Sequence, residues 1–193
     1  RELFEGLWIA DKWDWEKRYP VIHFSLKSLN YLQRGLEESL AERIGEIAQN
    51  YGVALAQTTA TDRLRELIIA LKERGKVAVL IDEYDAPIVD YLGRDMDQAI
   101  CNQNHLKSFY TVLKDMDAHL QFVLLTGVSR FSKVGIFSGL NNLVDLTGDE
   151  EYATMLGYTQ EELENNFEAE IADAAQRMGI GRGELLDKMQ FWY

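Results

Sequence analysis

Three acidic residues lie close together directly after an uninterrupted apolar run. The run is Val77-Ala-Val-Leu-Ile81, and Asp82, Glu83 and Asp85 follow it. Such a run is typical of a strand that is buried on both faces and delivers its acids to its carboxyl end. One carboxylate there can hold the water shell of a phosphate-bound Mg²⁺, and a second can orient or deprotonate an attacking water. The same pattern also fits a core strand that ends in solvated acids, so the rest of the chain must decide.

A second informative stretch follows another predicted strand. Leu120–Thr126 is apolar up to Thr126, and residues 127–142 after it are rich in Gly, Ser and Asn and include Arg130 and Lys133. Parallel α/β proteins bind ligands in loops that leave the carboxyl ends of their strands. We therefore expect this loop and the acids after Ile81 to lie at the same edge of a sheet.

The elements around these stretches alternate between strand and helix. Pro20–Leu26 reads as a strand, and Leu32, Leu36, Leu40, Ile44, Ile47 and Tyr51 predict one long amphipathic helix, with Asn30 as its cap and Gly52 at its end. Further helices are predicted over Leu64–Leu71, Ile88–Leu92 and Asp97–Met116, with a short strand at Leu143–Thr147. This alternation favours right-handed crossovers in a mainly parallel sheet, an α/β fold.

The carboxyl-terminal part of the chain has a purely helical pattern. Thr159-Gln-Glu-Glu162 is a capping box ahead of apolar residues at helical spacing, and Gly179–Gly183 interrupts that pattern before a final helix. We predict a core domain at residues 1–150 and a small helical subdomain at 151–193.

Composition and charge exclude several classes of protein. The formal net charge of −12 argues against a general nucleic-acid-binding surface. Cys101 is the sole cysteine, so no intrachain disulfide can form. The apolar runs are strand-sized, and the first residues lack the layout of a signal peptide. We expect a soluble cytoplasmic protein that has no membrane contact.

Four ordered blocks of the sequence resemble those of a bacterial protein family. The blocks are Val79–Ile88, Phe122–Val134, Ile136–Leu143 and Tyr152–Leu163. They resemble the AAA-ATPase-like proteins, which usually carry a carboxyl-terminal domain of the PD-(D/E)XK nuclease superfamily. The resemblance extends over nearly the whole chain and implies a three-layer P-loop NTPase core in which the strand before Asp82 is the Walker B strand.

The resemblance also implies a role for each candidate residue. Asp82 would bind Mg²⁺ through water, Glu83 would be the general base, and Thr126 would sense the γ-phosphate of ATP. Arg130 would stabilise charge, and Ser129 and Lys133 would contact the nucleotide. Asp85 would hold the metal-binding groups in position without binding Mg²⁺ directly. The alternatives are a strand-end hydroxyl at Thr126, solvated or ion-paired cations at Arg130 and Lys133, and a helix cap at Asp85.

One departure from the family pattern bears on activity. No G-x-x-x-x-G-K-[ST] loop occurs in the sequence, so the amides and Lys that cradle the β-phosphate are missing. The nuclease signature is missing too, and both ends of the chain look cut, so we interpret the chain as a fragment. ATP and Mg²⁺ are expected to bind only together with an upstream segment. Without that segment, Leu120–Leu125 would be an unpaired edge able to dimerise or to take up a foreign strand.

Two functions of different classes follow. The first is the Walker B and sensor portion of an ATP-hydrolysing protein. The second is a non-catalytic interaction or switch module of a larger nuclease-linked protein, in which the acids form a structural network and the helical tail binds a partner. A metal-dependent phosphoesterase built on Asp82, Glu83 and Asp85 is disfavoured, because no histidine or further acid at a sensible spacing completes a second metal site.

Overall fold

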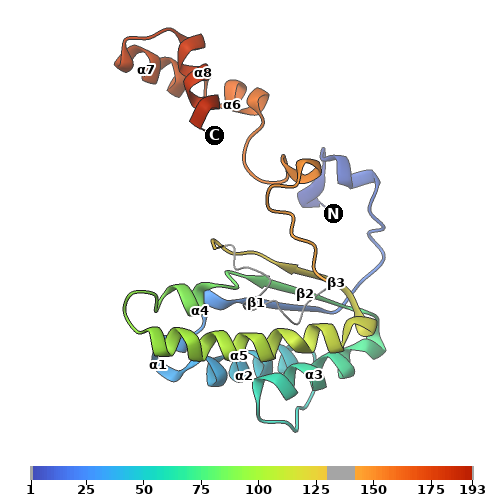
Figure 1. The fold of residues 1–193 in the computed structure, drawn as a ribbon. Helices are drawn as coiled ribbons and strands as arrows, with labels where there is room; N and C mark the ends of the chain where they lie inside the picture. Colours follow the sequence, from blue (N-terminus) through green and yellow to red (C-terminus); the bar gives the residue numbers. More distant parts are fainter. Residues whose placement is uncertain (1, 130–141, 193) are drawn as a thin grey trace. The chain divides into compact units, whose positions relative to one another are not determined.

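The computed structural model describes residues 2–129 and 142–192 of the chain (Figure 1). The chain divides into two compact units, residues 1–143 and 144–193. The first contains the sheet and the second contains the carboxyl-terminal helices. Within the described residues, no helix is long and apolar enough to cross a membrane.

The sheet of the first unit is parallel throughout. Its strands are β1 (Val21–Ser25), β2 (Val77–Asp82) and β3 (Leu120–Leu125), in the order β1-β2-β3. Each begins and ends within a residue or two of the predicted strand, and the predicted α/β fold is confirmed. The register places Ser25 beside Asp82 and Leu125 beside Ile81, so the three carboxyl ends share one edge.

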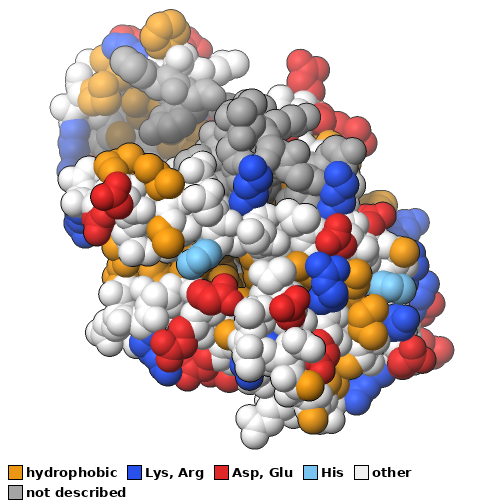
Figure 2. Space-filling model, turned by 60° about the horizontal axis from the view of Figure 1, so that its bottom comes forward, with side chains coloured by type: hydrophobic (Ala, Val, Ile, Leu, Met, Phe, Trp, Pro, Cys, Tyr) orange, Lys and Arg blue, Asp and Glu red, His pale blue; other side chains and the backbone are white. Residues whose placement is uncertain are grey.

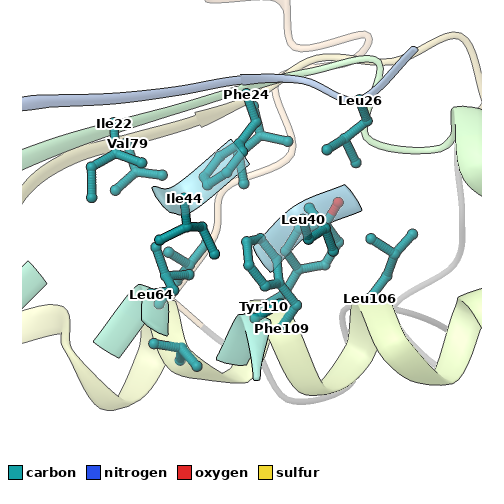
Figure 3. Close-up of a cluster of buried hydrophobic side chains, with 14 of the residues drawn as sticks. Ile22, Phe24, Leu26, Leu40, Ile44, Leu64, Val79, Leu106, Phe109 and Tyr110 are labelled. Atoms are coloured by element: carbon teal, nitrogen blue, oxygen red, sulfur yellow. The ribbon is translucent and has the colours of Figure 1, made fainter. Parts of the chain in front are cut away.

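Three long helices cover one face of this sheet (Figure 1). They are α2 (Leu36–Asn50), α3 (Ala60–Leu71) and α5 (Met96–Asp115), and α4 (Ala86–Val89) is a single turn after β2. The side chains of Phe24 on β1 and Phe109 on α5 meet edge to face, with ring centroids 5.5 Å apart (Figure 3). Burial of this interior supplies most of the driving force for folding.

The opposite face of the sheet carries exposed apolar side chains. Val21 on β1 is 39% exposed and Phe122 on β3 is 53% exposed, whereas Ile22 on β1 and Val79 on β2, on the helix side, are fully buried. Among the described residues, β3 pairs with β2 alone, so it is an edge strand. Both features are unusual for a parallel sheet, because such sheets normally have both faces covered.

The predicted long helix from Leu32 to Tyr51 is broken in two, and that part of the prediction is wrong. A single turn, α1 (Tyr31–Arg34), is separated from α2 by Gly35, whose φ of 83° lies in the left-handed region. A glycine adopts this conformation at little cost, and it interrupts the helical hydrogen bonding. Asn30 precedes α1 without a capping hydrogen bond from its side chain.

The second unit contains three helices, α6 (Gln160–Asn166), α7 (Glu168–Met178) and α8 (Arg182–Trp192). The predicted capping box of Thr159 and Glu162 is present at the start of α6. The core of the second unit is small, with Ile171, Ala175 and Leu185 buried. The strand predicted at Leu143–Thr147 is not formed. Residues 2–129 and 142–192 also contain six short 3-10 helices: Glu2–Phe4, Trp8–Asp11, Leu26–Ser28, Lys72–Arg74, Asp117–His119 and Glu150–Tyr152.

Candidate functional site

The tips of β2 and β3 bring two predicted site residues into contact. The hydroxyl of Thr126 donates a hydrogen bond to Oδ1 of Asp82, and the backbone N–H of Glu83 donates to the same oxygen at 3.0 Å. Both Asp82 and Thr126 are exposed. The strand ladder continues past the strands, because the N–H of Thr126 donates to the Ile81 carbonyl at 2.9 Å and the N–H of Tyr84 to the Thr126 carbonyl at 2.9 Å. An accessible carboxylate and hydroxyl are therefore held side by side.

Glu83 has an unfavourable backbone conformation. Its φ is 54°, and it is the sole non-glycine residue with a positive φ among residues 2–129 and 142–192. For a residue with a Cβ this conformation costs about 1–2 kcal/mol. Strain of this kind is concentrated at functional sites. Glu83 is half-buried, and its charge is near enough to contribute to raising the pKa of Tyr31.

Asp85 faces away from solvent, unlike Asp82. It is 1% exposed, and its carboxylate accepts hydrogen bonds from the backbone N–H groups of Ser129 at 2.6 Å and Val128 at 3.4 Å. Asp85 occupies the residue before α4, but its side chain makes no capping hydrogen bond to that helix. The acid predicted as a helix cap or as a support of the metal site therefore anchors the loop that follows β3.

Tyr84 strengthens the same connection. Its phenol donates a hydrogen bond to the carbonyl of Ser129, and its own carbonyl accepts one from the phenol of Tyr110 at 3.2 Å. Tyr110 lies on α5 and is fully buried, and burial raises its pKa well above the ordinary tyrosine value. The turn after β2 is thus attached both to the β3 loop and to the interior.

On the β1 side, the segment after β2 is held by Lys27, Tyr31 and Asp90, whose contact the sequence did not reveal. Nζ of Lys27 lies 2.5 Å from Oδ1 of Asp90, and the phenol of Tyr31 donates to Oδ2 of Asp90 at 2.6 Å. The hydrogen bonds from Lys27 and Tyr31 lower the pKa of Asp90. Burial and the bond to Asp90 raise the pKa of Tyr31. These residues are far apart in the sequence, and no local pattern announces their contact.

Two predicted residues, Arg130 and Lys133, lie outside the described residues. No group of three or more metal-binding side chains occurs in the part of the chain that the structure describes. One accessible carboxylate with a neighbouring hydroxyl nevertheless suits Mg²⁺, which keeps several waters and takes one or two carboxylates together with substrate phosphates. The donor set around Asp82 therefore fits a magnesium nucleotide whose phosphates are held from elsewhere.

An open cavity of about 690 Å³ lies away from these groups, with Arg34, Glu37, Glu42, Arg63, Asn102 and His105 in its lining. Arg34 is paired with Glu38 and Glu42, and Arg63 donates to the backbone carbonyls of Gln57 and Ala41. On the side of the molecule seen in Figure 2, acidic and basic side chains are likewise interspersed. Since both arginines of the cavity are already engaged, the carboxyl edge of the sheet is the stronger candidate site.

The first unit is therefore a parallel α/β domain whose candidate polar groups lie at the carboxyl edge of the sheet, the edge at which such domains bind ligands. Residues 1–137 match the family described as "Predicted AAA-ATPase", and the chain belongs to this AAA-ATPase-like family. It is 38% identical over 195 residues to a protein of Azotobacter chroococcum mcd 1 described as "Uncharacterized protein in vnfD 5'region". The match covers 99% of this chain and 36% of that relative. No solved structure matches the chain.

Proposed function

We propose that this chain contributes the metal-binding and water-activating part of an ATP-hydrolysing domain. The observation that carries the proposal is the contact between Thr126 and Asp82 at the adjacent tips of β3 and β2. Membership in a predicted AAA-ATPase family supports it. The phosphate-binding loop is not part of residues 1–193, so the activity belongs to a complete polypeptide that supplies this loop.

In this proposal each described residue has one task. Asp82 holds the water shell of Mg²⁺, which when bound neutralises charge on the phosphates. Glu83 accepts a proton from the attacking water. The Thr126 hydroxyl donates to the water or to the γ-phosphate. Ser129, Arg130 and Lys133 belong to the loop after β3 and are proposed to contact the nucleotide, with Arg130 stabilising developing charge.

We also propose a cytoplasmic location, because ATP is available there. The linked nuclease domain remains a prediction from the resemblance.

The test is ATP hydrolysis by the complete natural polypeptide that contains this sequence. Glu83→Gln is expected to retain Mg²⁺-dependent ATP binding while kcat falls about 10²- to 10⁴-fold, the usual contribution of a general base. Glu73→Gln is the matched control, because Glu73 is an exposed acid near the opposite end of the same strand. Hydrolysis at the full rate in Glu83→Gln would remove Glu83 from the mechanism.

A second candidate is an interaction module without catalysis. The exposed Phe122 and the one-sided pairing of β3 favour it, because such an edge is a template for an added strand. In this second function, Asp82, Glu83 and Asp85 stabilise the fold and take no part in catalysis. A titration of the complete polypeptide with ATP separates the two candidates, since the module has no Mg²⁺-dependent affinity for ATP.

A further inference from the structure

The turn after β2 and the loop after β3 make a set of contacts that the proposed chemistry does not use. Asp85 is buried and accepts the N–H groups of Val128 and Ser129, and Tyr84 donates to the Ser129 carbonyl. The backbone of Ser129 is thus held through both its N–H and its carbonyl. We refer to Tyr84, Asp85 and Gly127 together as the latch.

The Asp85 carboxylate is costly to bury unless it is satisfied. A charged group removed from water needs hydrogen bonds to compensate for lost solvation. Among the described residues, the hydrogen-bond partners of this carboxylate are backbone N–H groups of the loop after β3. Moving that loop away would leave a buried charge without these donors, so the loop is energetically fixed to the turn.

Gly127 supplies an independent sign of the same attachment. A Cβ placed on Gly127 would lie 2.6 Å from Oδ1 of Asp85 and 2.7 Å and 2.8 Å from two ring carbons of Tyr84. Real Cβ atoms do not approach so closely. Gly127 is not among the glycines with positive φ, so lack of space rather than backbone conformation demands a glycine here. The loop backbone therefore lies directly against Tyr84 and Asp85.

The latch is connected to the buried core on one side and to the candidate site on the other. The buried Tyr110 binds the carbonyl of Tyr84, and the N–H of Tyr84 binds the carbonyl of Thr126. Thr126 precedes Gly127, and its hydroxyl contacts Asp82. A displacement of the loop at Gly127 would therefore be transmitted to the hydroxyl beside Asp82.

We propose that Tyr84, Asp85 and Gly127 are positioning residues that fix the Thr126 hydroxyl relative to Asp82 and Glu83. This role rests on the proposed ATP hydrolysis. The latch makes the acids of β2 and the hydroxyl of β3 one rigid unit, so their separation does not depend on which ligand is bound. Misplacement of a catalytic group by about 1 Å can reduce a rate about 10²-fold.

The principal variant is Gly127→Ala in the complete natural polypeptide. The added methyl group is expected to displace the loop, lowering kcat for ATP by about tenfold or more while the KM for ATP stays within about twofold. Amide hydrogen exchange at Val128 and Ser129 should become faster in the nucleotide-free protein. Gly45→Ala is the matched control, since a Cβ on Gly45 would meet only ordinary contact, 3.5 Å from Arg63.

Two further variants keep the test decisive if Gly127→Ala folds poorly. Tyr84→Phe keeps the ring but removes the hydroxyl that donates to the Ser129 carbonyl, and it should change kcat and amide exchange in the same direction by less. Ile68→Val removes a buried methylene on α3, far from the latch in the sequence, and should lower stability without lowering kcat. A fall in kcat for Ile68→Val equal to that for Tyr84→Phe would reduce the latch to a general stabilising element.

The outcomes separate this proposal from the proposed function. If the wild-type polypeptide hydrolyses ATP and all latch variants keep its kcat, the positioning role is wrong. If the wild type does not hydrolyse ATP, the proposed function fails and the positioning role fails with it. Exchange at Val128 and Ser129 then still reports whether the latch fixes the loop, because that measurement needs no nucleotide.

Discussion

The turn after β2 is held in different ways on its two sides. Toward β3, Asp85 and Tyr84 bind backbone groups of one short loop, and Asp85 is almost fully buried. Toward β1, Asp90 binds the side chains of Lys27 and Tyr31, and the Lys27 side chain is 51% exposed. Backbone groups are fixed in place, whereas an exposed lysine is free to reorient in water. The β3 side is therefore built for fixed geometry, and the β1 side can respond to pH and salt.

The largest effect is expected where this comparison places the strongest attachment. Asp85→Ala leaves the N–H groups of Val128 and Ser129 without their acceptor, and it should lower the free energy of unfolding by about 1–3 kcal/mol. Chemical denaturation followed by tryptophan fluorescence measures the change. Asp97→Ala, at an exposed acid in the first turn of α5, is the control. Equal losses in the two variants would contradict a special role for the buried acid.

A smaller loss is expected on the β1 side. Asp90→Ala deprives the buried Tyr31 phenol of its acceptor and should cost about 1–2 kcal/mol in the same measurement. Lys27→Ala should cost less, under about 1 kcal/mol, because its ion pair is largely solvated. A Lys27 variant that loses more than the Asp90 variant would reverse the assignment of the stronger contact to Tyr31.

The pH dependence of the stabilisation by Asp90 gives a sharper version of this test. The pKa of Asp90 in the folded protein is lowered from the ordinary value of 3.8. A lowered pKa means that the stabilisation is fully present above that ordinary value and is lost as the pH falls through the folded pKa. The stability difference between wild type and Asp90→Asn should therefore shrink on going from about pH 6 to about pH 3. A difference that grows in acid would contradict the ion pair.

The smallest effect concerns Glu83, which lies between the two sides. Glu83→Gly should leave the protein at least as stable as wild type, because relief of the left-handed strain of about 1–2 kcal/mol offsets the greater entropy of an unfolded chain containing glycine. Glu83→Ala keeps a Cβ and should show no such gain. A loss above about 1 kcal/mol in Glu83→Gly would mean that side-chain contacts of Glu83 outweigh its strain.

Much of the fold could be predicted because its strands are strong, short signals. The apolar runs ending at Asp82 and Thr126 identified β2 and β3, and two such strands joined by a helix imply parallel pairing. The break at Gly35 was missed because the apolar spacing of Leu32, Leu36 and Leu40 continues across it. A lone glycine within such spacing is usually tolerated in a helix, and only its positive φ reveals the interruption.

The candidate site was predicted less completely, for a different physical reason. That Asp82 and the residues around Thr126 would lie at one edge of the sheet followed from the parallel pairing of their strands. The burial of Asp85 did not follow, because its partners are backbone N–H groups, which every residue but proline possesses and no sequence pattern marks. The contact of Lys27 and Tyr31 with Asp90 was invisible likewise, since it joins residues separated by 63 and 59 positions.

The close approach at Gly127 has a consequence for how variants of this protein are interpreted. In a mutational scan, every substitution at this position places a Cβ against Asp85 and Tyr84. Gly127 should therefore tolerate replacement as poorly as the proposed general base Glu83 when survival depends on activity, although Gly127 carries no functional group. Intolerance at Gly127 would originate in excluded volume, whereas intolerance at Glu83 would originate in the chemistry proposed for it.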